Sequence, residues 1–208
     1  MSTKKILFFD TETTGLVDDF TPVENQPSMV QFGAILWVYE IDHFEEGGFE
    51  IISEETIDLL FKPLKPIPQK LTDIHGISNE MVADKPEFES YAKEFVRMCR
   101  DADIIVGHNL EFDKNMMFVE LDRVYPSKSP EKDEFKRMFK EKSICTMQNS
   151  INFCAIKNYR GFKYPKLSEL HVKLFWKDFD NAHNALQDII ATRNCFFELK
   201  RLWLINFL

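Results

Sequence analysis

A short apolar run near the start of the chain, Lys5–Phe9, is followed directly by two acids, Asp10 and Glu12. The run predicts a buried strand, and in an extended chain side chains two residues apart point to the same face. Asp10 and Glu12 are therefore expected to lie close together, where their like charges repel unless a cation offsets them. Because Mg²⁺ favours carboxylate oxygens, the stretch is either part of a metal site or a pair of solvated acids at a strand end.

Strand-forming segments come first in the chain and alternate with amphipathic helical segments later. The predicted strands are residues 5–9, 29–39, 50–61, 103–106 and 143–145, and the predicted helices are residues 87–100, 110–124, 146–156, 168–176 and 184–205. The first three strands form an antiparallel meander because their connections are short. This order favours an α/β fold with a mixed five-stranded sheet flanked by helices. Ligands of such sheets gather at the carboxyl ends of strands, where Asp10 is expected.

The segments between these elements give weaker predictions. The proline-rich stretch 63–68 prevents regular structure, and residues 71–78 are expected to form a loop with one helical turn. Residues 126–142 mix lysine and glutamate and are expected to be a mobile connection or an exposed helix. Since 208 residues show no internal repeat and no clear linker, the chain is predicted to be a single domain, residues 1–208.

Composition argues against several classes of protein. No apolar run reaches 18 residues, so no transmembrane helix is expected, and the first residues show neither the apolar stretch nor the cleavage site of a signal peptide. The cysteines, Cys99, Cys145, Cys154 and Cys195, lack C-x-x-C spacing, which argues against a zinc site or a disulfide framework. We therefore expect a cytoplasmic protein with reduced thiols and no membrane partner.

The charge of the chain is divided unevenly along its length. The net charge is −8, which by itself disfavours a nucleic-acid partner. Residues 1–127, however, carry 25 acids against 11 lysines and arginines, whereas residues 128–208 carry 9 acids against 15. An acidic half beside a basic half suits a metal site next to a surface that follows a polyanion. Chance variation of surface residues would also produce this division.

Two further segments bring acids toward the sheet edge where Asp10 is expected. Asp113 falls in the first turn of the helix 110–124, and Asp188 falls near the start of the last helix, five residues after His183. A histidine with an unperturbed pKa of about 6.5 is suited to accept a proton near neutrality. Taken singly, these residues are better explained as an ordinary first-turn acid and as a capping or surface histidine followed by a surface acid. Together they bring four carboxylates and one histidine to one place.

The order Asp-x-Glu, then Asp, then His-x-x-x-x-Asp resembles the three motifs of the DEDDh exonucleases of the ribonuclease H-like superfamily. The motifs correspond to DTETTGL at residues 10–16, HNLEFD at 108–113 and AHNALQD at 182–188. The sequence is similar to the proofreading members of ribonuclease T and DNA polymerase III ε-subunit type. The resemblance spans about residues 4–200, and it implies a ribonuclease H-like fold.

This resemblance implies a metal-dependent 3′–5′ exonuclease that releases nucleoside 5′-monophosphates. The substrate would be the free 3′ end of DNA, single-stranded or frayed, in preference to RNA. The implied metal ligands, for two Mg²⁺ ions or Mn²⁺ in their place, are Asp10, Glu12, Asp113 and Asp188. His183 would be the general base, and Glu12 would also take part in catalysis. The chemistry is consistent, because two metals about 4 Å apart can hold both the attacking and the leaving oxygen of a phosphodiester.

The same resemblance implies that Thr11, Glu12, Leu16 and His75 contact the terminal nucleotide. Leu16 is expected to wedge against the base, and its alternative is a core leucine. His75 is expected near the substrate, and its alternative is a solvent-exposed loop histidine. His108 stands just before a helix, where it is expected to order the loop and not to act as the base.

Residues 155–177 carry six lysines and arginines and one acid, with aromatic residues at Tyr159, Phe162 and Tyr164. Bases stack on aromatic rings and basic side chains meet phosphates, so this composition suits contact with a strand. The alternative is a solvated loop whose aromatic side chains pack on the core.

Rival functions differ in what they require of the site. An RNA-trimming exoribonuclease of the same family would need the same residues, because the 2′-OH is sensed by local geometry. A non-catalytic nucleic-acid-binding module would not need four carboxylates and His183. A subunit that docks onto a polymerase could use the hydrophobic end 202–208, which could equally close the core. An unrelated metal hydrolase is disfavoured because no HExxH motif occurs.

Overall fold

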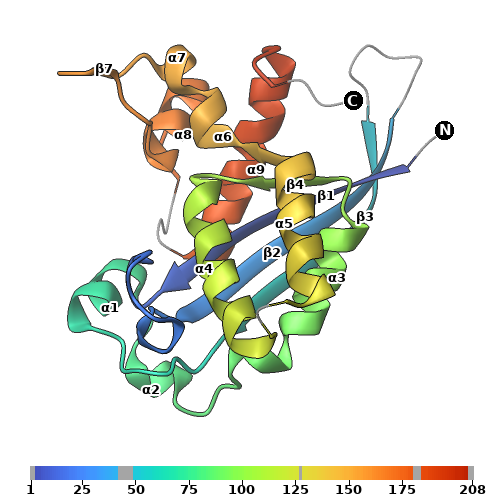
Figure 1. The fold of residues 1–208 in the computed structure, drawn as a ribbon. Helices are drawn as coiled ribbons and strands as arrows, with labels where there is room; N and C mark the ends of the chain where they lie inside the picture. The colour runs from blue at the N-terminus through green and yellow to red at the C-terminus, as the bar shows by residue number, and fades with distance from the viewer. Residues whose placement is uncertain (1–2, 42–48, 127, 180–183, 206–208) are drawn as a thin grey trace.

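A five-stranded mixed sheet forms the centre of the computed structural model, which describes residues 3–41, 49–126, 128–179 and 184–205 (Figure 1). Its strands lie in the order β3-β2-β1-β4-β5. They are β1 (Thr3–Thr13), β2 (Met29–Ile41), β3 (Phe49–Leu60), β4 (Ile104–Gly107) and β5 (Ser143–Cys145), with a separate hairpin of β6 (Lys157–Asn158) and β7 (Gly161–Phe162). The first three strands are antiparallel, and β4 and β5 run parallel to β1. The predicted mixed five-stranded sheet is therefore confirmed.

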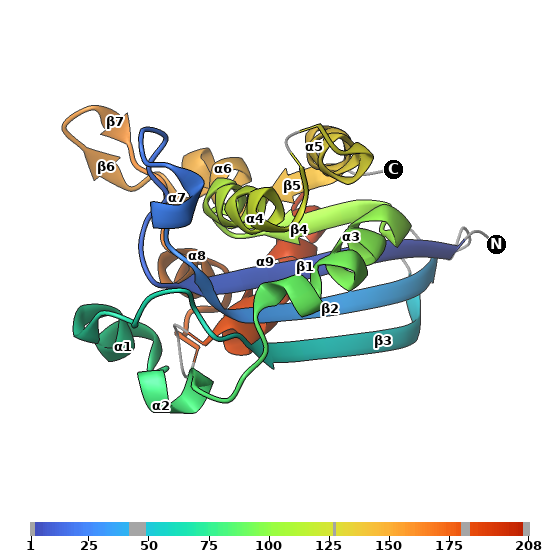
Figure 2. The ribbon, with the colours of Figure 1, turned by 60° about the horizontal axis from the view of Figure 1, so that its bottom comes forward.

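Helices cover both faces of this sheet (Figure 2). They are α1 (Gln69–His75), α2 (Asn79–Val82), α3 (Ala92–Asp101), α4 (Leu110–Val124), α5 (Pro130–Lys142), α6 (Thr146–Asn149), α7 (Ile151–Cys154), α8 (Leu167–Phe175) and α9 (Ala185–Arg201). Short 3₁₀ turns occur at Val23–Asn25 and Phe88–Ser90. Helices α3, α4 and α5 lie on one face, and α8 and α9 lie on the other. Among the described residues, no helix is both long enough and apolar enough to cross a membrane.

Alternation along β1 divides the core into these two layers. Leu7 and Phe9 pack with the residues of α3, α4 and α5, whereas Ile6 and Phe8 pack with α8 and α9. All four side chains are fully buried, at 0–1% exposure. Because successive side chains of a strand point to opposite faces, a run of four large apolar residues can supply both layers at once. The two layers fix β1 firmly, and β1 carries the acids of interest.

Three predicted elements differ from the structure. Strand β1 continues past Phe9 to Thr13, because β2 pairs with it along its whole length, so the acids lie inside the strand and not after its end. Residues 126–142 are not simply an exposed or mobile connection, since α5 buries Phe135, Met138 and Phe139. The helical turn expected within 71–78 is a two-turn helix, α1, that begins at Gln69.

His108 joins three segments at the end of β4. Its Nδ1 lies 2.9 Å from Oγ1 of Thr146, and its Nε2 lies 3.1 Å from the carbonyl oxygen of Pro165. A carbonyl can only accept, so Nε2 carries the proton and Nδ1 of the neutral ring accepts from the Thr146 hydroxyl. Burial lowers the pKa of His108 to about 4. The expectation that His108 orders this loop is confirmed by these contacts.

We expect His108→Gln to make the stability less sensitive to pH. The folded pKa of about 4 lies below the unfolded value of about 6.5. As the pH falls from 6.5 toward 4, the unfolded chain therefore binds a proton first and stability is lost. This one group should cost the wild type about 2 kcal/mol between pH 7 and pH 5. Denaturant unfolding of both proteins at both pH values measures the difference, and identical pH dependence would contradict the assignment.

Candidate metal centre

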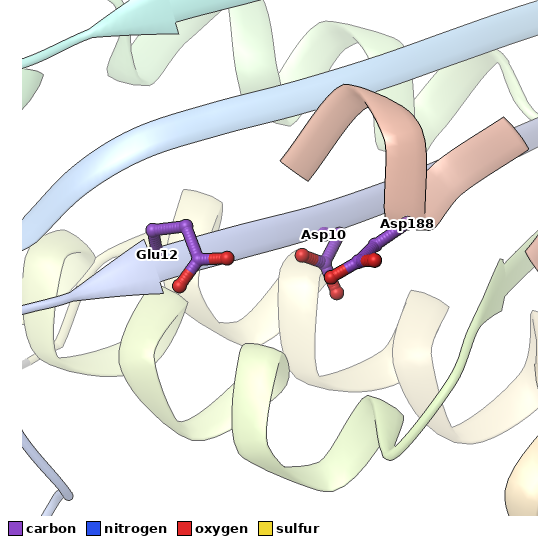
Figure 3. A group of neighbouring side chains, drawn as sticks. All are labelled: Asp10, Glu12 and Asp188. Carbon is purple, nitrogen blue, oxygen red and sulfur yellow. The ribbon is translucent and has the colours of Figure 1, made fainter. Parts of the chain in front are cut away.

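Three carboxylates from two distant parts of the chain meet at the edge of the sheet (Figure 3). Asp10 and Glu12 project from the same face of β1, and Asp188 projects from the first turn of α9. One oxygen atom from each of the three lies within 4.8 Å of the others. The structure therefore places three of the acids that the sequence analysis expects to meet close to one another.

The fourth predicted acid, Asp113, is held beside this group by Thr11. Asp113 lies in the first turn of α4 and is 1% exposed. Its Oδ1 accepts hydrogen bonds from the Thr11 amide at 3.0 Å and from the Thr11 hydroxyl at 2.8 Å. The pairing of β4 with β1 ends at Phe8, so the edge of β1 beyond that point is open to a helix side chain. Asp113 takes that place, and its charge acts on the other three acids.

Asp188 reaches Asp10 because α9 approaches β2 unusually closely at Gly33. Gly33 is the β2 residue directly opposite Asp10. A Cβ atom at Gly33 would lie 2.7 Å from Cδ1 of Ile189 and 3.1 Å from both the carbonyl carbon and Cβ of Ala185. Only a residue without a side chain allows the first turns of α9 to lie this near the strand.

A buried glutamine, Gln31, fixes the start of the same helix. Its Oε1 accepts a hydrogen bond from the Ala185 amide at 3.3 Å, and its Nε2 donates to Asp58 at 2.7 Å. Sequence analysis missed both Gly33 and Gln31. A signal was present for Gln31, since a polar residue that interrupts an apolar strand needs a hydrogen-bonding partner when buried.

Burial and mutual repulsion disfavour the ionised form of these acids. Burial is the main cause that raises the pKa of Asp10 well above its usual value, followed by the charges of Asp113, Asp188 and Glu12. The same causes, burial first and then Asp188, raise the pKa of Glu12 to about 8. Burial also raises the pKa of Asp113 to about 7, although its hydrogen bonds with Thr11 act in the opposite direction. The site thus binds protons unless something else neutralises it.

A hard divalent cation fits this set of donors. Carboxylate oxygens are the ligands that Mg²⁺ and Mn²⁺ prefer, and the convergent, partly buried acids of this site would be relieved of their repulsion by a cation. Residues Asp10, Glu12 and Asp188 could hold one ion directly, with Asp113 beside them.

The predicted substrate residues have varied surroundings. Leu16 is 79% exposed on the loop after β1, so the alternative of a core leucine is wrong. His75 is 8% exposed, and its Nδ1 accepts from the Ile77 amide at 3.1 Å, so the alternative of an exposed loop histidine is also wrong. Thr11 is 3% exposed and uses both its amide and its hydroxyl on Asp113. His183 lies outside the described residues.

Hydrogen bonds from Arg123 anchor the loop that carries Leu16. The guanidinium of Arg123 donates to the carbonyl oxygens of Val23, Gln26 and Pro27 at 2.8–3.2 Å. These bonds fix the later part of the loop, at residues 23–27, whereas Leu16 itself is exposed to solvent.

Aromatic side chains of the basic segment 155–177 are likewise turned outward. Tyr159, Phe162 and Tyr164 are 88%, 47% and 59% exposed. The alternative that these three rings pack on the core is therefore wrong.

Comparison with known proteins gives a family and related chains. The chain matches the sequence model of the ribonuclease T-type exonuclease family over residues 7–196. The epsilon subunit of DNA polymerase III from Aquifex aeolicus is 31% identical over 159 residues, which cover 76% of this chain and 69% of that subunit. An uncharacterized exonuclease of Escherichia phage 186 is 27% identical over 187 residues, covering 89% of this chain and 83% of that protein.

A solved structure shares the fold. The crystal structure of E. coli exonuclease I in complex with a dA16 oligonucleotide superimposes with a TM-score of 0.67 at 19% identity. The match covers 95% of this chain and 41% of exonuclease I, so this chain spans about two fifths of the length of that protein. The similarity shows a common ribonuclease H-like fold, as the sequence motifs implied.

We expect Gly33→Ala to loosen α9 and weaken cation binding. Overpacking of this kind costs about 1–3 kcal/mol, and here it pushes the turn that bears Asp188 away from Asp10. Denaturant unfolding and calorimetric titration with Mg²⁺ measure the two effects. The matched control is Gly33→Ala combined with Ile189→Val, which removes the Cδ1 atom in the way and should restore part of both. Unchanged Mg²⁺ affinity in Gly33→Ala would contradict the role of this close approach.

We expect Asp10→Asn to stabilise the cation-free protein. Asparagine cannot ionise, so the variant avoids the folding free energy that Asp10 gives up because burial and its neighbours disfavour its ionised form. The melting temperature in chelator should therefore rise, by about 2–4 °C for each kcal/mol gained. Addition of Mg²⁺ should stabilise the wild type and leave the variant almost unchanged. Asp84→Asn, which changes an exposed acid elsewhere, is the control for net charge. An Asp10→Asn protein that melts lower in chelator would argue against carboxylate repulsion at this site.

Proposed function

The chain belongs to the ribonuclease T-type, or DEDDh, exonuclease family, and from this premise we propose that it is a 3′–5′ exonuclease acting on DNA. It would release nucleoside 5′-monophosphates from single-stranded or frayed 3′ ends. The observation that carries the proposal is the convergence of Asp10, Glu12 and Asp188, with oxygen atoms within 4.8 Å of one another. We also propose that residues 1–208 act as a single exonuclease domain, which the long match to the family supports.

The proposed roles follow from the chemistry of each residue. Asp10, Glu12, Asp113 and Asp188 would hold two divalent cations, Mg²⁺ or Mn²⁺ in its place. Such cations, when bound, acidify a water molecule and offset the charge of the reacting phosphate. His183 would accept the proton of the attacking water as general base, since its ordinary pKa is about 6.5. The hydroxide formed in this way would add to phosphorus as the bond to the 3′ oxygen of the preceding nucleotide breaks, and that oxygen would take up a proton from solvent to become a 3′ hydroxyl.

Substrate contacts are proposed around the same edge of the sheet. Glu12 and the Thr11 backbone would meet the terminal nucleotide, Leu16 would wedge against its base, and His75 would lie near the strand. The exposure of Leu16 at the sheet edge supports a wedge. The outward rings and basic side chains of the segment 155–177 would follow the strand further from its end.

We propose DNA in preference to RNA because two similar proteins are named for DNA or were solved with it. The Aquifex aeolicus relative is a DNA polymerase III subunit, and the E. coli structure holds a dA16 oligonucleotide. Because the first of these proteins is a polymerase subunit, we also propose a polymerase or other replication partner for this chain. Activity of the isolated chain, with and without a polymerase, would test the need for a partner.

Digestion of matched DNA and RNA strands tests the reaction directly. With Mg²⁺, 5′-labelled DNA should shorten stepwise, and 3′-labelled DNA should release labelled mononucleotide at once. RNA of the same sequence should be cut more slowly. Excess chelator should abolish the reaction. Stepwise loss from the 5′ end, or undiminished activity in chelator, would refute the proposal.

We expect His183→Ala to lower turnover about 10²–10⁴-fold, the usual contribution of a general base, with little change in strand binding. Single-turnover rates and fluorescence anisotropy with a labelled oligonucleotide separate the two quantities. His171→Ala, at a buried histidine of α8, is the control for loss of an imidazole. Equal losses of rate and affinity in His183→Ala would mean that His183 is not the base.

A further inference from the structure

A hollow lined by lysines lies on the side of α4 that is turned away from the carboxylates. It has a volume of about 450 Å³ and lies between α4, α5 and the segment from β5 to α6, whose positions can be followed in Figure 1. Three of its lining residues are Lys114, Lys136 and Lys140. We propose that this hollow binds a phosphate group, from the nucleic-acid strand or from a released mononucleotide. The inference rests on the proposed function and adds a second contact site to it.

The charges in the hollow are unbalanced. Lys114 is paired with Glu111 at 2.5 Å, and Lys136 lies over the ring of Phe118 at 5.8 Å. Within the described part of the chain, neither Lys136 nor Lys140 has a carboxylate oxygen within 4 Å. Three lysines and one acid therefore line the hollow, in a protein whose net charge is −8. The excess of positive charge would attract an anion.

The lining of the hollow suits a phosphate and its attached groups. Lysine binds phosphate as a point charge, and the amide side chains of Gln148 and Asn149 add polar groups to the wall. Phe118 and Phe139 provide apolar surface that a sugar or base could cover. The volume lies in the range of about 300–1,000 Å³ that is typical of small-molecule sites.

Helix geometry places the hollow and the carboxylates on different sides of α4. Glu111, Lys114 and Phe118 share one face of α4, because residues three and four apart are neighbours on a helix. At 100° per residue, Asp113 points well away from that face. A strand that passes around the first turn of α4 could place a later phosphate among the lysines.

The test compares two double variants that lose the same charge. Lys136→Gln with Lys140→Gln removes lysines of the hollow, whereas Lys128→Gln with Arg137→Gln removes exposed positive charges nearby that do not line it. Affinity for long and short labelled oligodeoxynucleotides is measured in chelator by fluorescence anisotropy, between about 50 and 200 mM salt. Direct binding of a nucleoside monophosphate is measured beside it by calorimetric titration. Circular dichroism and melting temperature verify the fold of each variant.

If the hollow binds a phosphate of the strand, the Lys136→Gln, Lys140→Gln variant should bind long oligonucleotides more weakly than the wild type and short ones equally well. Its slope of log affinity against log salt should then fall in magnitude by about 0.7 for each lysine lost. If the hollow binds a mononucleotide, only the calorimetric affinity for the nucleoside monophosphate falls. A loss of either affinity that is larger in the Lys136→Gln, Lys140→Gln variant than in the control variant supports the inference. Equal losses in the two variants overturn it. Absence of hydrolysis with Mg²⁺ in the wild type would refute the proposed function separately, because binding is measured without it.

Discussion

Repulsion among the carboxylates at the edge of β1 is the constraint on which the rest of the structure depends. Burial and neighbouring charge raise the pKa of Glu12 to about 8 and that of Asp113 to about 7. A group whose pKa is raised in the folded state gives up stability above its ordinary pKa, so near neutrality these acids oppose folding. Packing of the two apolar layers against β1 must therefore stabilise the fold by more than these acids destabilise it. Functional sites are often held in such unfavourable states by a stable scaffold.

Close backbone approach is the means by which the fold enforces this proximity. Gly33 lets α9 come near enough for Asp188 to meet Asp10, and Gln31 holds the first amide of that helix. On the other side, the Thr11 amide and hydroxyl fix the carboxylate of Asp113. Asp188 and Asp113 are thus positioned by a packing contact and by hydrogen bonds, and Asp10 and Glu12 by the pairing of β1 with β2. The charges of the four acids oppose the arrangement.

The sequence predicts the sheet, its order of elements and the acids that meet, because those follow from local apolar patterns and from short motifs. It does not predict that β1 extends to Thr13, since Thr and Glu carry no apolar signal and the pairing with β2 decides the end. The packing of α5 was hidden because charged residues surround Phe135 and its apolar neighbours. The need for glycine at position 33 arises from a helix about 150 residues later, which no local pattern reveals.

Helix α4 connects the acidic site with the lysine-lined hollow. Successive residues of its first turns, which point about 100° apart, serve different sides: Asp113 turns toward Thr11, and Lys114 turns toward the hollow. At the start of this helix, a Cβ at Gly107 would come within 2.6 Å of Cδ1 of Leu110, so the glycine leaves room for the Leu110 side chain. A shift of this turn would therefore move an acid and a lysine together. Because α4 carries Asp113 as well as Lys114, its position would influence how far a cation held by the carboxylates lies from an anion bound in the hollow.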